Sequence, residues 1–224
     1  MRHWPLTQLT LTTPDLVLRV PDDAQLDELA QVAADGVHPP GAVCFPQSWA
    51  SGTPEEAASN VVQNHWWARG DWNDDNWRLL LAVLHDGQVI GQQNLSARDF
   101  RITREARTGF WLGRRFQGQG FGTQMRAAAL HLAFTSLGAE RVTSTAFADN
   151  AASRRVSEKL GYTPNGVRRL AVDQHLVEAH EAVLTAERWH RQAQQPILAE
   201  GFDACRHMFG VLAAPEPVDV VRHV

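Results

Sequence analysis

A glycine-rich run is the part of this chain whose residue types and spacing point most directly to chemistry. It reads Gln117-Gly118-Gln119-Gly120-Phe121-Gly122-Thr123 and stands between an expected strand and an expected helix. Glycines at alternate positions let successive backbone N–H groups face one point, and the start of a helix adds partial positive charge there. Such a turn binds phosphate or pyrophosphate, although a tight strand-to-helix connection would also explain it.

Two better-known phosphate motifs do not fit this run. A Walker loop ends in Gly-Lys followed by Ser or Thr, whereas the only lysine of the chain is Lys159. The dinucleotide-binding fingerprint needs a glycine where Thr123 stands, and it belongs to the first βαβ unit of a chain. The turn therefore predicts an anion site of another kind.

A second run of interest spans residues 149–162. Asp149 or Asn150 is expected to cap a helix that carries Ser153 in its first turn, and Gly161 is expected to end that helix. A hydroxyl group near the start of a helix is chemically useful where a polar ligand docks. Capping alone would also account for Asn150.

Both runs need a framework of strands and helices, which the hydrophobic pattern predicts. We expect strands at residues 16–20, 77–84, 89–95, 108–112, 141–146 and 177–184. We expect helices at 22–35, 54–68, 123–137 and 151–160, and a short one at Glu187. The helix at 54–68 follows a capping box of Thr53 and Glu56, and Asp86-Gly87 joins two strands as a hairpin. Residues 36–53, rich in proline and glycine, are expected to form a functional loop, and residues 215–224 a loose tail.

Composition and charge narrow the class of protein. Apolar residues make up 44% of the chain, which excludes a disordered protein. The net charge of -4 argues against a nucleic-acid partner. This average hides an uneven distribution, because residues 1–97 have 12 acidic and 4 basic side chains whereas residues 98–224 have 13 and 17. A local anion site beside an acidic surface is consistent with this division.

The sequence gives no sign of a metal site, a disulfide framework or a membrane span. Cys44 and Cys205 lie far apart and have no partners at metal-binding spacing. His180-Glu181 begins a zinc-hydrolase pattern, but Leu184 stands where the second histidine is required. No apolar run approaches the roughly 18 residues of a spanning helix, so we expect a cytoplasmic protein without a membrane partner.

Taken together, the two runs resemble the GNAT family of N-acyltransferases. Gln117-x-x-Gly120-x-Gly122 is similar to the pyrophosphate motif of that family, and residues 149–162 resemble a later helix of its ribosomal-protein N-terminal acetyltransferase branch. The expected order of elements agrees over roughly residues 14–192. Four further segments, 2–6, 99–104, 122–128 and 201–206, resemble a mycobacterial succinyltransferase of the same family.

The resemblance implies an α+β fold. Its sheet is mixed but mostly antiparallel, is flanked by helices, and is splayed open at its middle, where acyl-CoA binds. We expect residues 1–195 to form this N-acyltransferase domain and residues 196–224 to form a C-terminal extension. The extension packs either on its own domain or against another subunit of a homo-oligomer.

The resemblance also assigns acyl-CoA binding to one strand end, the glycine-rich turn and the start of the later helix. These residues are Trp111, Leu112, Arg114, Gln117, Gly118, Gln119, Gly120, Phe121, Gly122, Thr123, Asn150, Ser153 and Arg154. No metal takes part in this assignment.

Direct attack of an amine on a thioester requires a base, a donor for the oxyanion and an acid for the leaving thiolate. By resemblance, Ser153 is the acid, and the backbone N–H of Trp111 or Leu112 is the oxyanion donor. Asn150 is expected to hold the pantetheine arm close to the reacting atoms.

The base is left open by the sequence. Asp99 and Glu105 precede the relevant strand, and Asp99 is the candidate we carry forward, with a water relay as the alternative. Tyr162, the sole tyrosine, falls where the family keeps a core aromatic residue.

The sequence constrains the identity of the acyl donor and of the acceptor less than it constrains the CoA site. Succinyl-CoA would need a partner for its extra carboxylate, which Arg98, Arg101 or Arg104 could supply, and we expect it to bind more tightly than acetyl-CoA. The acceptor is a primary amine, from a protein or peptide N-terminus, a lysine or a small molecule. Residues 36–53 and the helix end at His65-Trp66-Trp67 are expected to form its site. An antibiotic- or metabolite-modifying acetyltransferase and a catalytically silent acyl-CoA sensor are the alternative functions.

Overall fold

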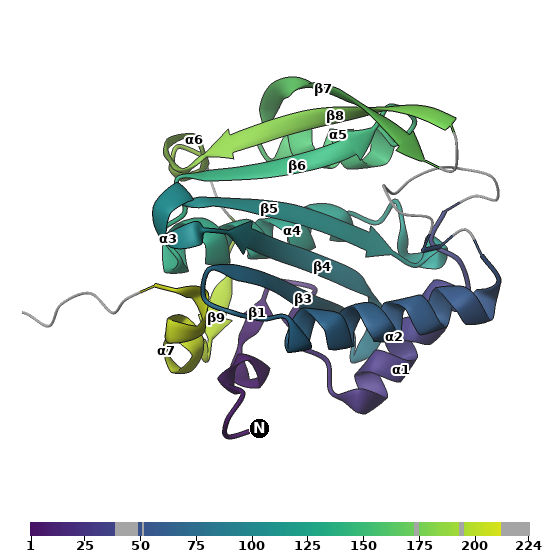
Figure 1. Cartoon of the computed structure of the whole chain (residues 1–224), viewed down its shortest axis with the longest axis horizontal. Helices are drawn as coiled ribbons and strands as arrows, with labels where there is room; N and C mark the ends of the chain where they lie inside the picture. Colours follow the sequence, from purple (N-terminus) through teal and green to yellow (C-terminus); the bar gives the residue numbers. More distant parts are fainter. Residues whose placement is uncertain (39–48, 51, 173–174, 193–194, 212–224) are drawn as a thin grey trace, which may run out of the picture.

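A single mixed sheet organises the molecule in the computed structural model, which describes residues 1–38, 49–50, 52–172, 175–192 and 195–211 (Figure 1). The strand order is β7-β8-β6-β5-β4-β3-β2-β1-β9, and every neighbouring pair is antiparallel except β5 and β6, which are parallel. The predicted α+β fold with a mostly antiparallel sheet is therefore confirmed. The strands are β1 (Thr10–Thr12), β2 (Val17–Arg19), β3 (Asn76–His85), β4 (Gln88–Arg98), β5 (Glu105–Leu112), β6 (Arg141–Phe147), β7 (Thr163–Val172), β8 (His175–Thr185) and β9 (Leu198–Glu200).

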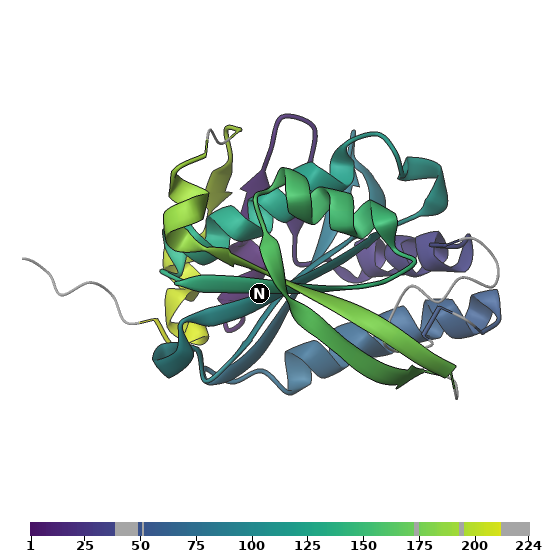
Figure 2. The ribbon, with the colours of Figure 1, turned by 90° about the horizontal axis from the view of Figure 1, so that it is seen from above.

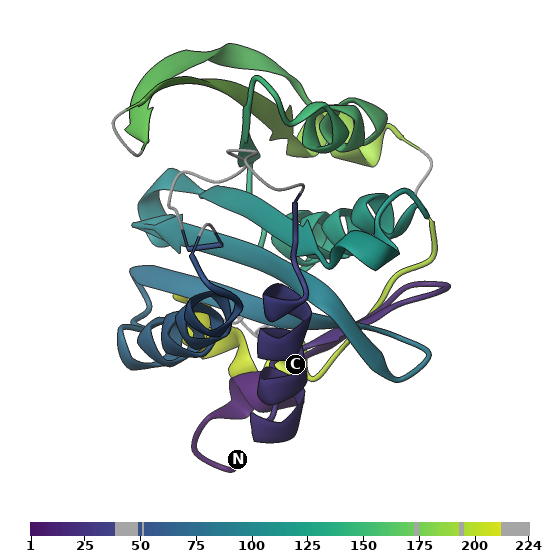
Figure 3. The same cartoon turned by 90° about the vertical axis from the view of Figure 1, so that its right-hand side faces the viewer.

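Helices cover both faces of the sheet (Figures 2 and 3). On one face lie α1 (Asp23–Ala34) and α2 (Pro54–Gly70), and on the other lie α4 (Phe121–His131) and α5 (Ala151–Lys159). Short helices are α3 (Phe100–Thr103), α6 (Ala186–His190) and α7 (Phe202–Cys205). None of the described helices combines the length and the apolar composition needed to cross a bilayer.

Local signals explain how the helices on the α1 and α2 face begin. Asp22 accepts a hydrogen bond from the Gln25 N–H at the start of α1, and the Gln25 side chain bonds back to the Asp22 N–H. Thr53 and Glu56 form the same reciprocal capping box at α2, as the sequence predicts. Such a box satisfies two donors that would otherwise be left free at the helix start.

The central strand β3 is buried on both faces. Leu79, Leu81 and Val83 belong to the larger core cluster, which includes residues of α4, whereas Ala82 and Leu84 pack with residues of α1 and α2. Burial on both sides explains why the apolar run of β3 is continuous and does not alternate.

Several elements differ from the sequence prediction. The helix expected at 123–137 begins at Phe121 and is α-helical to His131, after which Leu132–Ser136 forms a π-helical turn. The sequence did not predict strands β1, β7 and β9, because β1 and β9 are three residues long and β7 is mostly exposed and includes Pro164 and Gly166. Hydrogen bonding to neighbouring strands, rather than a local sequence pattern, holds these three segments in the extended conformation.

The described part of the predicted extension packs on the domain. Strand β9 pairs antiparallel with β1, and Phe202, Cys205 and Phe209 lie in the larger core cluster. Residues 215–224, predicted as a tail, lie outside the described residues, as does most of the predicted loop at 36–53.

Candidate active site

The two parallel strands at the centre of the sheet pair over only part of their length. Glu105–Thr108 of β5 pair with Arg141–Ser144 of β6. Beyond these residues, 109–112 pair only with β4 and 145–147 pair only with β8. Figure 1 shows β5 and β6 diverging along these segments. Their facing edges therefore have backbone groups that an extended ligand could pair with.

Alternate residues of β5 point their backbone N–H and carbonyl groups at this open edge. The N–H of Gly113 donates to the Ile90 carbonyl, on β4, at 3.0 Å. Because hydrogen-bonding direction alternates along a strand, Trp111 directs its backbone groups at β4, as Gly113 does. Phe110 and Leu112 direct theirs at the open edge. Of the two predicted oxyanion donors, Leu112 has the suitable orientation and Trp111 does not.

The glycine-rich turn connects β5 to α4. A short 3-10 helix (Arg114–Phe116) follows β5, and Gly118 and Gly120 then have φ angles of +77° and +90°. Gly120 is the N-cap of α4, and no heavy atom lies within 4 Å of a Cβ added to either glycine. The space beside both glycines is therefore open, and the first N–H groups of a helix lack partners within it, so an anion could bind at the start of α4.

Gln117, the first residue of the motif, anchors the turn. Its side-chain amide donates to the Val37 carbonyl at 2.8 Å and to the Leu112 carbonyl at 2.9 Å. Both bonds hold the amide against neighbouring backbone. The Gln117 side chain therefore positions the turn, and the backbone N–H groups of the turn are its candidates for contact with an anion.

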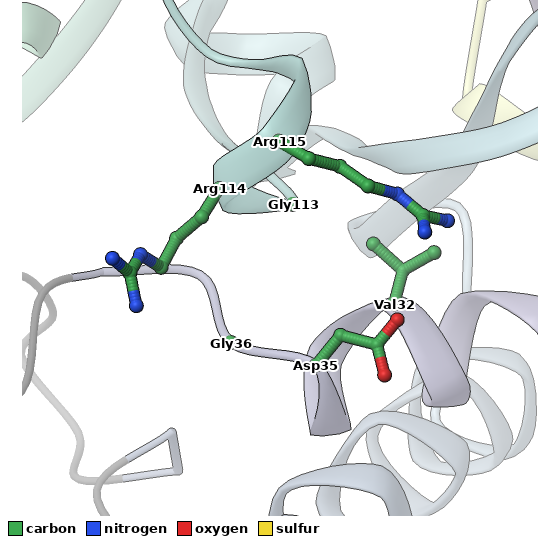
Figure 4. A pocket seen from close by; sticks show the side chains of 6 residues that line it. All are labelled: Val32, Asp35, Gly36, Gly113, Arg114 and Arg115. Atoms are coloured by element: carbon green, nitrogen blue, oxygen red, sulfur yellow. The ribbon is translucent and has the colours of Figure 1, made fainter.

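A cavity of about 340 Å³ adjoins the start of the turn. Its lining residues are Val32, Asp35, Gly36, Gly113, Arg114 and Arg115 (Figure 4). Figure 4 shows Arg115 extending toward Val32 and Asp35, while Arg114 extends past Gly36. Two guanidinium groups near a hollow suit a ligand with several phosphate groups.

Helix α5 begins at the end of β6. The Oδ1 of Asn150 accepts a hydrogen bond from the Ser153 N–H at 3.0 Å, which confirms that Asn150 is the helix cap. Arg154 donates from Nη1 to the carbonyls of Phe147 and Ala148. Asn150 and Ser153 therefore lie beside the free segment of β6, whereas the Arg154 guanidinium is engaged with backbone.

Arg126, which the sequence analysis missed, joins α4 to α5. Its side chain is 1% exposed, and its guanidinium donates to Ser157 Oγ at 2.6 Å and to Ser153 Oγ at 3.4 Å. The guanidinium carbon lies 4.5 Å from the centre of the Phe110 ring, on β5. A signal was present in the sequence, because Arg126 interrupts the apolar residues 125–130. Helix α4, helix α5 and the open segment of β5 meet at this side chain.

A second buried polar network lies on the face covered by α2. His65 is 2% exposed, and its Nε2 is 2.8 Å from Gln92 Oε1. Gln92 Nε2 in turn donates to Asn94 Oδ1 at 2.6 Å. Desolvation lowers the pKa of His65 to about 4, so the imidazole is neutral near pH 7. Gln92 pairs with Trp111 of β5, which places this network beside the open segment, while Trp66 and Trp67 are exposed.

The predicted base is not brought to the open edge. Leu112 pairs with Gly91 near the start of β4, whereas Asp99 follows the last residue of that strand. At about 3.3 Å per residue, Asp99 is on the order of 25 Å from Gly91. Its place next to β5 in the sequence was misleading because Asp99 lies near the start of β5, whereas the open segment is the end of that strand.

The arginines predicted to select succinyl-CoA lie at the same remote end. Arg101 is held there by ion pairs with Asp74 at 3.4 Å and Asp75 at 2.6 Å. Tyr162, by contrast, is a buried core residue whose hydroxyl lies 3.0 Å from Thr108 Oγ1. Across the described ranges, no cluster of three or more His, Cys, Asp or Glu side chains could hold a metal ion.

Comparison with known proteins agrees with this geometry. The sequence model of the protein family described as acetyltransferase (GNAT) domain matches residues 15–163. In Bacillus subtilis (strain 168), "Putative ribosomal N-acetyltransferase YdaF" is 32% identical over 88 residues, which are 39% of this chain and 48% of YdaF. The matched part therefore spans about half the length of this curated relative.

Solved structures share the fold at low sequence identity. Mycobacterium smegmatis RimJ, in complex with a CoA disulfide, is 19% identical with a TM-score of 0.63, over 85% of this chain and 92% of RimJ. RimL, an alpha-N-protein acetyltransferase of a ribosomal protein in complex with coenzyme A, is 20% identical with a TM-score of 0.58, over 77% of this chain and 95% of RimL. These similarities support the same sheet and helix arrangement.

Proposed function

This chain belongs to the GNAT acetyltransferase family, and from that premise we propose that it is an N-acyltransferase that moves an acyl group from a CoA thioester to a primary amine. The observation that carries the proposal is the partial pairing of β5 and β6 next to the glycine-rich turn. An extended ligand with a phosphate-rich end matches both features. Acyl-CoA has this form.

Three parts of the chain would bind CoA. The outward backbone groups of Phe110 would pair with a pantetheine amide, and Asn150 would contact the same arm from α5, while the Leu112 N–H is kept for the acyl oxygen. The N–H groups at the start of α4, after Gly120, would bind the pyrophosphate. The cations of Arg114 and Arg115, at the neighbouring cavity, would attract the remaining phosphate charge.

The chemical step follows from the orientation of β5. The amine attacks the thioester carbon, and the backbone N–H of Leu112 stabilises the oxyanion that forms. The Ser153 hydroxyl donates to the sulfur as the carbon–sulfur bond breaks. A water relay takes the proton from the amine, since Asp99 and Glu105 belong to the end of the sheet where β5 and β6 remain paired.

For the acceptor, we propose the α-amino group of a protein. The names of YdaF and RimL assign ribosomal and alpha-N-protein acetylation to those relatives, and this is the support for the proposal. The acidic residues of the first half of the chain suit a cationic amine. Acetyl-CoA is the favoured donor because Arg101, a predicted partner of a succinyl carboxylate, is paired with Asp74 and Asp75.

Thiol release tests the function. Acetyl-CoA and succinyl-CoA are each incubated with peptides bearing free α-amino groups, with peptides whose only amine is a lysine, and with aminoglycosides. We expect CoA release with acetyl-CoA and the α-amino peptides. Preference for an aminoglycoside would favour the antibiotic-modifying alternative, and tight CoA binding without release would favour a silent sensor.

Ser153→Ala tests the role of the hydroxyl group in this reaction. General acid groups typically contribute about 100-fold to 10,000-fold. We expect kcat to fall about tenfold, which is below this range because a hydroxyl is a weak acid, while the Kd for CoA stays close to that of the unchanged protein. An unchanged kcat would remove Ser153 from the mechanism.

A further inference from the structure

Arg126 is a fully buried cation whose neighbours are neutral hydroxyl groups and aromatic rings. It is 1% exposed, and its Nη1 and Nη2 donate to Ser157 and Ser153. The Phe110 ring lies 4.5 Å from the guanidinium carbon and the Tyr162 ring 5.8 Å from it. Among the described residues, Arg126 Nε is buried and has no hydrogen-bond partner.

No ion pair involves Arg126 in the part of the chain that the structure describes. Burial lowers the pKa of its guanidinium, yet arginine stays protonated in proteins. A buried charge without a counter-ion is strongly destabilising, and a cation–π contact offsets only part of this cost. An apolar side chain of similar volume would pack this site at lower cost.

The two serine hydroxyls differ in the use of their hydrogen atoms. The Ser157 hydroxyl accepts from Arg126 and donates to the Ser153 carbonyl at 3.2 Å. The Ser153 hydroxyl accepts from Arg126 at 3.4 Å, and the hydrogen bonds of the described chain include none that it donates. Ser153 is also half-buried, so a ligand can reach it from the open side of α5.

We propose that Arg126 is a positioning residue for acyl transfer: it orients the Ser153 hydroxyl toward the CoA sulfur and supplies, through that hydroxyl, positive charge that stabilises the leaving thiolate. This inference rests on the proposed function. An aliphatic hydroxyl is a far weaker acid than a thiol, so Ser153 alone would be a poor proton donor. A buried cation at hydrogen-bond distance makes the same hydroxyl a stronger donor.

The bonds and protons of the step balance. The carbon–nitrogen bond of the product forms, and the carbon–sulfur bond breaks with its electron pair on sulfur. The amine loses one proton to solvent. The sulfur takes one proton through the Ser153 hydroxyl, which solvent restores, and CoA leaves as the thiol.

The pKa of the thiol of bound CoA reports the effect of the Arg126 charge, and its measurement needs no acceptor amine. Its ionisation is followed by the ultraviolet absorbance of the thiolate as a function of pH, in complexes with the unchanged protein, Arg126→Met, Ser153→Ala and the double variant. An opposite charge nearby lowers the pKa of an acid by about 1 to 3. Because Arg126 acts here through Ser153, we expect a decrease of about 1 relative to free CoA in the unchanged protein, and a return toward free CoA in both single variants.

The double variant separates positioning from packing. If Arg126 acts through Ser153, the double variant resembles the single variants, and Arg126→Met lowers kcat about tenfold with little change in KM for acyl-CoA. The inference would be overturned if the thiol pKa were equal in the unchanged protein and in Arg126→Met. It would also be overturned if the thiol pKa changes caused by Arg126→Met and Ser153→Ala were additive in the double variant. Ser157→Ala is the matched control, because it removes the shorter Arg126 bond and keeps Ser153. It should retain at least half of the thiol pKa decrease.

The folding of each variant and its affinity for CoA are measured together with the thiol pKa. Should Arg126→Met fail to fold, Arg126→Gln carries the same expectation, since its amide can bond the serines without the charge. Calorimetry with CoA distinguishes a failure of the proposed function from a failure of the inference about Arg126. If the unchanged protein does not bind CoA, the proposed function fails, and the inference fails with it; if CoA binds and the thiol pKa is insensitive to Arg126, only the inference fails.

Discussion

His65 makes a specific contribution to how stability depends on pH. It lies in α2, 2% exposed, and its Nε2 is 2.8 Å from Gln92 Oε1. Because the Gln92 oxygen can only accept, this nitrogen carries the hydrogen of the neutral ring. Protonation would add a proton to the other nitrogen and put a positive charge on a buried ring. Burial accordingly lowers the pKa of His65 from 6.5 to about 4.

The direction and size of the effect follow from these two values. Because the pKa of His65 is lower in the folded state, the unfolded chain binds more protons between pH 6.5 and 4. Stability is therefore fully present above pH 6.5 and is lost as the pH falls toward 4. The complete loss corresponds to about 3 kcal/mol, of which about 2 kcal/mol falls between pH 7.5 and pH 5.

Urea unfolding followed by tryptophan fluorescence tests this prediction. The unchanged protein, His65→Gln and a control, His175→Gln at an exposed position of β8, are compared at pH 7.5 and pH 5. We expect the free energy of unfolding of the unchanged protein to fall by about 2 kcal/mol more than that of His65→Gln. The glutamine amide can still donate to Gln92, so the variant should fold. Equal losses in the two proteins would refute the assignment of a buried neutral imidazole.

Three further results are expected. Gly120→Ala, at a φ of +90°, should strain the turn by about 1 to 3 kcal/mol and weaken CoA binding about tenfold by calorimetry, and equal affinity would exclude the turn from the phosphate site. Asp99→Asn should keep kcat within about twofold, and a loss near 100-fold would restore Asp99 as the base. Acetyl-CoA should bind at least as tightly as succinyl-CoA by calorimetry, because Arg101 is paired with Asp75; tighter binding of succinyl-CoA would support the donor expected from the sequence.

The role of Gln117 bears on how the pyrophosphate motif is interpreted in this chain. A glutamine at the head of a phosphate-binding run invites the interpretation that its amide contacts the phosphate. Here the amide bonds the carbonyls of Val37 and Leu112 and so connects the turn to the segment after α1 and to the end of β5. The same bond occupies the Leu112 carbonyl and leaves the Leu112 N–H for the ligand.

Local patterns in the sequence determined much of the framework. The capping box at Thr53, the Asp86-Gly87 hairpin, the glycine-rich turn and the Asn150 cap all involve residues within a few positions of one another. Such features depend on backbone conformation and short-range hydrogen bonds, which residue type largely sets. The sequence therefore predicted where the glycine-rich turn and the start of α5 lie.

Only the tertiary structure decided which of these groups meet. The open edge arises because β5 and β6, some 36 residues apart in the chain, pair over Glu105–Thr108 and no further. Arg126 contacts Ser153 across 27 positions, and His65 contacts Gln92 across 27 positions. Asp99 is close to β5 in sequence yet lies at the remote end of β4. Periodicity reports which face of an element is buried, but register and packing between distant elements fix which polar groups share a site.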